Sequence, residues 1–176
     1  VTLPGVFRDL FRKSGRPMTA ALDLTVAAPR HHVFLGMSGK QELDLPTGTR
    51  SAQVEAITEI FGRDPWSPWV DGLAEDWDTC RRFVFETVAT DEDLQALAGR
   101  LSVHQTAYAS AHRALRHPKL EKMALDRWLF VGHDPKLTPA AWNMWHYVER
   151  NFGRWRFEND LAGLNQALAK RLTERK

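Results

Sequence analysis

The sequence predicts an α+β fold, with a small N-terminal antiparallel β-meander of about three strands followed by a predominantly helical part of about six helices. Before residue 48, apolar and polar residues alternate in three short runs, which is typical of half-buried strands. From residue 49 onward, apolar residues recur every three or four positions, which is typical of helices that pack on a core. A chain of 176 residues has an ordinary length for one domain. We therefore expect residues 1–176 to form a single domain, with an arm and the β-element in 1–48 and the helical part in 49–176.

The three alternating runs cover residues 19–27, 31–35 and 41–45. In the first run, leucine and valine side chains share one face, and Pro29 ends the strand because proline cannot donate a ladder hydrogen bond. The second and third runs are joined by Gly36–Gly39, a link of the length and composition of a hairpin turn. We expect the three strands to pair consecutively.

Capping residues mark several helix boundaries. Thr49 is a good N-cap for a helix that ends before Gly62, because glycine readily adopts the left-handed conformation that closes a helix. Residues 64–69 (DPWSPW) contain two prolines and predict a tight loop. Thr138-Pro139 predicts a helix start, and residues 157–172 form an amphipathic helix.

Composition limits the class of protein. The chain is 43% hydrophobic and 26% charged, which is typical of a globular protein and not of a disordered one. No apolar run approaches the ~20 residues that span a bilayer, so we expect no membrane association. Cys80 is the single cysteine, which excludes an internal disulfide framework and fits the reducing cytoplasm. We therefore expect a cytoplasmic protein.

Residues 90–115 resemble the helix-turn-helix reader of bacterial DNA-binding proteins. Thr90 caps an acidic first turn, and a small residue, Ala98, would let two helices approach closely. Leu101-Ser102-Val103 occupies the position of the tight turn, and a second helix would begin at His104. The resemblance implies that the outer face of this second helix meets nucleic acid.

Our first hypothesis is therefore a non-enzymatic, bacterial-type cytoplasmic protein that binds nucleic acid, either DNA or RNA, or a nucleoprotein assembly. The net charge of +2 and the basic segments at residues 1–16 and 100–122 agree with a polyanionic partner. The candidate residues for bases and phosphates are Gln105, Ser110, Arg113, Arg116, Lys119 and Lys122, together with Arg8, Arg12 and Lys13 of the N-terminal arm.

Two alternatives stay open. The chain holds seven tryptophans, and a protein–protein adaptor or inhibitor would use Trp66 and Trp69 of the proline loop together with Asp76 and Asp78 of the acidic segment 71–93. An enzyme with a site assembled from scattered residues is the third hypothesis, although no catalytic motif supports it.

The sequence implies no cofactor and no metal site. The seven histidines form neither HExxH nor an HxH pair. The segment 36–40 (GMSGK) lacks the spacing of a phosphate-binding loop and is followed by a predicted strand instead of a helix. Cys80 lies among apolar positions, where cysteine usually serves as an inert packing residue.

Overall fold

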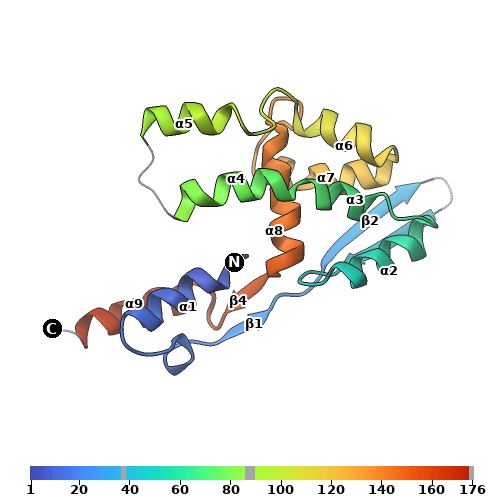
Figure 1. Ribbon diagram of the computed structural model, residues 1–176. Helices are drawn as coiled ribbons and strands as arrows, with labels where there is room; N and C mark the ends of the chain where they lie inside the picture. The colour runs from blue at the N-terminus through green and yellow to red at the C-terminus, as the bar shows by residue number, and fades with distance from the viewer. Residues whose placement is uncertain (37–38, 86–89, 175–176) are drawn as a thin grey trace.

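The computed structural model describes residues 1–36, 39–85 and 90–174, which form a mostly helical α+β structure (Figure 1). Over these residues the α-helices are α1 (Pro4–Lys13), α2 (Arg50–Phe61), α3 (Trp66–Gly72), α4 (Ala74–Phe85), α5 (Asp91–Ala98), α6 (Ala107–Leu115), α7 (Pro118–Phe130), α8 (Met144–Phe152) and α9 (Asp160–Thr173). The strands are β1 (Leu24–Val26), β2 (Arg30–Gly36), β3 (Gly39–Leu45) and β4 (Trp155–Phe157), and two short 3-10 helices are η1 (Met18–Ala20) and η2 (Ala140–Asn143). The α+β class is confirmed, with more helices than the sequence predicts.

The predicted pairing of the second and third strands is confirmed. β2 and β3 are antiparallel, in a register that runs from the pair Arg30–Leu45 to the pair Gly36–Gly39. Residues 37–38 of the predicted turn lie outside the described residues. Phe34 of β2 and Leu43 of β3 are buried in the main core, to which α2 also contributes, so the hairpin presents one face to the helical part.

The first strand does not join this hairpin, so the predicted three-stranded meander is wrong. β1 is antiparallel to β4, with Val26 opposite Trp155, and the described strands form two separate two-stranded sheets. The predicted run 19–27 is also shorter as a strand, because η1 occupies residues 18–20. Alternation of apolar and polar residues predicts a strand, but it does not identify a partner more than a hundred positions away.

Two predicted loop and helix boundaries need correction. The proline loop at residues 64–69 is in fact the start of α3, because the Asp64 side chain accepts a hydrogen bond from the Ser67 N–H at 2.9 Å and Trp66 packs inward. Thr138-Pro139 leads first into η2, and α8 begins only at Met144. There the Ala140 N–H donates to the Gln105 carbonyl at 2.7 Å, which ties this segment to the link before α6.

Helix α8 runs through the middle of the molecule, from the level of α6 and α7, past α4, to the sheet of β1 and β4 (Figure 1). Its residue Val148 is fully buried in the main core, which also holds Trp66, Trp69, Trp77 and Trp128. A second, smaller core joins α1 and α9 to the β1–β4 sheet; its buried members are Phe11, Met18, Leu22, Phe157, Leu164 and Ala167. The end of α8 leads directly into β4, whose partner β1 is followed in the chain by β2 of the hairpin.

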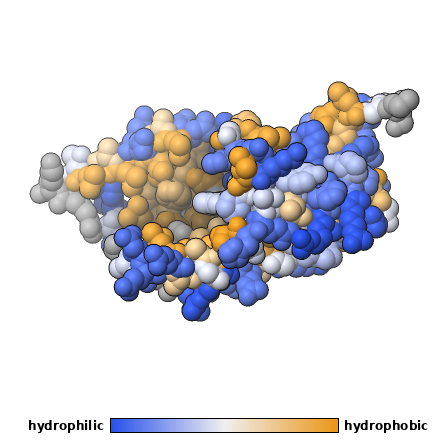
Figure 2. All heavy atoms as spheres, turned by 90° about the horizontal axis from the view of Figure 1, so that it is seen from above, coloured by the Kyte–Doolittle hydropathy of each residue, from blue (hydrophilic) through white to orange (hydrophobic). Residues whose placement is uncertain are grey.

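Among the described residues, no helix has the length and apolar character needed to cross a membrane. The face shown in Figure 2 carries hydrophobic patches among mostly hydrophilic residues.

Candidate functional site

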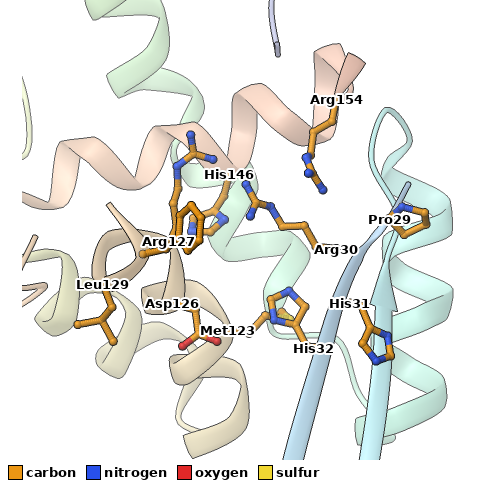
Figure 3. Close-up of a pocket in the computed structure, with 11 residues that line it drawn as sticks. Pro29, Arg30, His31, His32, Met123, Asp126, Arg127, Leu129, His146 and Arg154 are labelled. Atoms are coloured by element: carbon orange, nitrogen blue, oxygen red, sulfur yellow. The ribbon is translucent and has the colours of Figure 1, made fainter. Parts of the chain in front are cut away.

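A cavity of about 570 Å³ lies where the start of β2 faces α7 and the end of α8 (Figure 3). Its walls carry Arg30 from β2, Arg127 from α7 and Arg154 from the link between α8 and β4, and we call these three residues the arginine cluster. Figure 3 shows their side chains around the same space. The cavity thus collects guanidinium groups from three segments that are distant in the sequence.

Glu149 of α8 is the buried counter-ion of two of these arginines, with 6% of its surface exposed. Arg30 donates to both carboxylate oxygens, from Nε to Oε2 at 2.9 Å and from Nη2 to Oε1 at 2.7 Å. Arg127 donates from Nη1 to the same Oε1. Burial alone would raise the pKa of Glu149, but the hydrogen bonds and charges of the two arginines outweigh it and lower the pKa to about 2. Glu149 is therefore ionised and fixes both guanidinium groups.

Arg154 has no ion pair with a carboxylate among the described residues. Its Nη1 donates only to the carbonyl of Ala28, at 3.3 Å. Burial lowers the pKa of its guanidinium, and the positive charges of Arg30 and Arg127 lower it further, against the opposing effect of Glu149. Arginine stays protonated at neutral pH despite such shifts. The cavity therefore holds three positive groups, with the carboxylate of Glu149 paired to two of them and the carboxylate of Asp126 on the wall paired to Lys122.

The backbone conformation of Gly153 positions Arg154 at the cavity. This residue ends α8 with φ of 74°, a conformation that glycine adopts without the steric cost of a side chain. A Cβ atom here would lie 3.1 Å from Nε1 of Trp155, so the site also has little room for one. The sharp change of chain direction brings Arg154 back beside Ala28 and β2.

Two neutral histidines complete the polar walls of the cavity. His146 donates from Nε2 to the Ala124 carbonyl at 2.9 Å, and burial lowers its pKa to about 4. Burial likewise lowers the pKa of His32 to about 4. The buried Nε2 of His32 has no hydrogen-bond partner among the described groups. At neutral pH these imidazoles are uncharged, so the positive charge of the cavity comes from the arginines.

Two of the residues expected to bind nucleic acid lie on α7 on the side that faces β2. Lys119 donates from Nζ to Oε1 of Gln41 at 2.6 Å and lies over the ring of Phe34. Lys122 is exposed and pairs with Asp126, one of the residues that line the cavity, at 2.8 Å. These lysines lie on the same helix as Arg127, and the charge of Lys122 is partly neutralised by Asp126.

The two helices expected to form a helix-turn-helix are farther apart in the chain than that motif requires. α5 ends at Ala98 and α6 begins at Ala107, so the second helix does not begin at His104 and the residues between them do not form a tight turn. Thr106 caps α6 by accepting a hydrogen bond from the Ala109 N–H at 3.1 Å. No residue of α5 is buried, whereas α6 packs against α7 and η2.

The polar residues expected on the outer face of α6 therefore fall into two groups: two make contacts within the protein, and two are exposed. Ser110 accepts a hydrogen bond from Nε1 of Trp69 at 3.4 Å, and Gln105 lies in the link and binds η2 through its carbonyl. Arg113 and Arg116 are exposed at the end of α6, beside the stacked rings of Tyr108 and His112. These two arginines line a different surface from the cavity of the arginine cluster.

The basic residues of the N-terminal arm lie on α1. Arg8 is exposed and lies over the ring of Trp155, 5.3 Å from its centre. Arg12 and Lys13 both pair with Asp9, which neutralises part of their charge. None of the three lines the cavity of the arginine cluster.

The residues expected to bind a protein partner are mostly inaccessible. Trp66 and Trp69 are 1% and 8% exposed, so neither can be an anchor on the surface. Asp76 is buried and accepts a hydrogen bond from the Ser102 N–H at 3.1 Å. Asp78 alone is exposed, in an ion pair with Arg81. Residues 86–89 of the acidic segment lie outside the described residues.

Sequence reasoning missed the arginine cluster and Glu149. Arg30 follows Pro29 at the start of a strand, and Arg154 follows a glycine at the end of a helix, which are ordinary positions for surface arginines. A carboxylate at position 149 in a helix with a strongly apolar face is the one local signal, because a buried carboxylate needs cationic partners. The identity of those partners depends on the tertiary fold.

Within the described parts of the chain, no group of three or more histidine, cysteine, aspartate or glutamate side chains is placed to hold a metal ion. No model of a known protein family matches the sequence, and no curated protein matches it either. Function is therefore argued from the geometry of the site.

Proposed function

We propose that this protein binds nucleic acid without catalysing a reaction, and that the arginine cluster receives a phosphate group of the strand. One observation carries the proposal: three guanidinium groups lie around the buried carboxylate of Glu149, and Arg154 has no carboxylate partner among the described residues. The second carboxylate of the cavity wall, Asp126, pairs with Lys122. All three arginines are partly shielded from water, which favours an anion beside them. A phosphate in the cavity would supply that anion.

The donors needed to hold a phosphate remain in the cavity. A guanidinium carries five N–H donors, and Arg30 uses the donors on two of its nitrogens for Glu149. Arg127 uses one nitrogen for Glu149, and Arg154 uses one for Ala28. Arginine binds phosphate with paired, charge-assisted hydrogen bonds, which makes it well suited to such a site.

A polymer fits this surface better than a single phosphate because two lysines follow the cavity along α7. Lys122 is exposed and pairs with Asp126 of the cavity wall, and Lys119, which hydrogen-bonds to Gln41, lies one turn farther along the same helix. A phosphate would replace these partners of the lysines. Successive phosphates of a strand would meet these groups in turn, and each contact releases condensed counterions. Free phosphate, in contrast, would occupy the arginine cluster alone.

The test measures the affinity of the purified protein for labelled single-stranded DNA, RNA and duplex DNA of one length across a salt series. We expect affinity to fall steeply with salt, and Arg154→Gln to weaken binding and to reduce the slope of log K against log salt by about 1. Arg82→Gln is the matched control, because Arg82 is an exposed arginine on α4 outside the cavity. Free phosphate is included as a competitor at equal ionic strength.

Two results would overturn the proposal. The first is no binding of any polymer at low salt, and the second is equal affinity of the wild type and Arg154→Gln. Binding of free phosphate with no affinity for a polymer would instead assign the cavity to a small anion and would likewise reject nucleic acid as the ligand.

A further inference from the structure

A second cavity, of about 530 Å³, opens beside the arginine cluster, between the end of α7, the link that follows it and the start of α8. Its walls include three tryptophans and three aliphatic side chains, namely Trp128, Trp142, Trp145, Val131, Leu137 and Pro139. We call it the tryptophan cavity. Its volume falls within the roughly 300–1,000 Å³ of typical small-ligand sites.

One side of the tryptophan cavity is buried and hydrogen-bonded, and the opposite side is open to solvent. Trp128 is 4% exposed, and its Nε1 donates to Oδ1 of the fully buried Asn143 at 3.0 Å. Trp142 and Leu137 are 48% and 81% exposed, so large apolar surfaces face solvent around the opening. Exposed aromatic and aliphatic groups around a formed cavity are typical of a binding site.

Arg127 belongs to both cavities. Its guanidinium lies 5.7 Å from the ring centre of Trp128 and 5.2 Å from that of Trp145, and it also hydrogen-bonds to Glu149 in the arginine cluster. An anionic group bound by the arginine cluster would therefore be directly beside an aromatic, apolar cavity. The two sites fit a ligand that carries an anionic group and a flat, weakly polar ring next to each other.

We infer that the tryptophan cavity receives an unpaired nucleobase of a single strand, whose phosphate lies in the arginine cluster. This inference rests on the proposed function. A nucleotide has the required combination of charge and ring, and bases stack on aromatic side chains in single-strand binding proteins. In a duplex the bases are stacked and paired, so none can enter the cavity without the cost of unpairing.

The inference predicts a preference for single strands that depends on bases and on Trp142. Stacking of one base on one aromatic side chain corresponds to about 5- to 150-fold in affinity. We therefore expect Trp142→Ala to weaken binding of single-stranded DNA or RNA at least 5-fold and to leave duplex binding within about twofold. Phe85→Ala is the matched control, because Phe85 on α4 is also 48% exposed and lies outside both cavities.

An abasic strand separates stacking from phosphate contacts, because it keeps the phosphates and lacks the bases. We expect the wild type to bind this strand less tightly than the natural strand, and Trp142→Ala to bind both with similar affinity. Leu137→Asp is a second variant at the mouth of the cavity, and we expect it to weaken binding of the natural strand as well. Circular dichroism and thermal unfolding verify that each variant is folded.

The outcomes distinguish the inference from the proposed function. If Arg154→Gln weakens binding while Trp142→Ala and Leu137→Asp leave single-strand affinity unchanged, the base site is wrong and the phosphate site stands. Equal affinity of the wild type for natural and abasic strands would also reject the base site. If no polymer binds at low salt, both the proposed function and this inference fail.

Discussion

The guanidinium of Arg127 lies 5.2 Å from the ring centre of Trp145 and forms part of the wall between the arginine cluster and the tryptophan cavity. On one side it hydrogen-bonds to Glu149, and on the other it covers two tryptophan rings. A single side chain thus couples a charged cavity to an apolar one. This contact is the structural basis for expecting one ligand to occupy both cavities.

Glu149→Gln removes the carboxylate that pairs with Arg30 and Arg127. We expect this variant to lose about 1.5–3 kcal/mol of unfolding free energy, because two partly buried guanidinium groups lose their charged hydrogen-bond acceptor. Urea denaturation measures the loss, and Glu59→Gln on the exposed side of α2 is the control. We also expect added sulfate to stabilise Glu149→Gln more than the wild type. An unchanged free energy of unfolding would show that Glu149 does not hold the cluster together.

Stability is expected to fall in acid as Glu149 becomes protonated. Its pKa in the folded protein is lowered to about 2, below the ordinary value of 4.5, so its stabilising effect is complete above about pH 4.5 and is lost as the pH falls toward 2. The measurement is the unfolding free energy of the wild type and of Glu149→Gln between pH 5 and pH 2. The difference between the two proteins should shrink through this range; a constant difference would contradict the assignment.

His146 adds a second pH dependence at higher pH. Its pKa falls from 6.5 to about 4 in the folded protein, so the unfolded chain binds more protons between these values and stability decreases as the pH falls from 6.5 to 4. The full effect is up to about 3 kcal/mol. His146→Phe should reduce this slope, leaving the part that His32 contributes, and keep the contacts with the Trp66 and Trp69 rings. His104→Phe, at an exposed position, is the control, and it should keep the slope of the wild type.

Asn143 supports the rigid wall of the tryptophan cavity. It is fully buried, accepts a hydrogen bond from Trp128 and donates to the Ala107 carbonyl at 3.3 Å. We expect Asn143→Ala to cost about 1–3 kcal/mol, because the buried indole N–H of Trp128 loses its partner. Chemical denaturation tests this, with the exposed Asn165→Ala on α9 as control. A loss no larger than that of the control would show that this hydrogen bond does not stabilise the wall.

Gly153→Ala tests whether the backbone conformation of Gly153 is needed to position Arg154. The positive φ of 74° strains any other residue, at a cost of order 1–3 kcal/mol, and the added Cβ would lie 3.1 Å from Nε1 of Trp155. We expect lower stability and weaker binding of nucleic acid by the folded fraction. Gly5→Ala on α1, where a Cβ would meet no atom within 4 Å, should be neutral or slightly stabilising.

Local patterns in the sequence predict the parts of the fold that local contacts determine. The β2–β3 hairpin and the α2 helix, with its cap at Thr49 and its end at Gly62, lie where alternation and capping rules place them. The strands β1 and β4 are separated in the chain by helices α2 to α8. No local rule identifies a partner at such a distance. The proline loop is helical from Trp66, where the Asp64 side chain accepts a hydrogen bond from the Ser67 N–H and both Trp66 and Trp69 are buried in the core.

The candidate site could not be predicted for the same reason. Arg30, Arg127 and Arg154 each look like an ordinary surface residue in their own neighbourhood, and only Glu149, in a helix with an apolar face, carries a local signal. Only the approach of β2 to α7 and α8 brings them together. Lys119 and Lys122 were expected to contact phosphates, and they lie on the same helix as Arg127. The prediction of phosphate contact at these two lysines stays a prediction.

The central claim is that phosphate contacts are made at the arginine cluster, and the direct test compares two surfaces in one experiment. The salt dependence of single-strand binding is measured for the wild type, for Arg154→Gln and for the double variant Arg113→Ala/Arg116→Ala, whose arginines lie at the exposed end of α6. Our account predicts a slope smaller by about 1 for Arg154→Gln and a slope equal to that of the wild type for the double variant. A wild-type slope for Arg154→Gln together with a reduced slope for the double variant would contradict it and would move the interface to α6.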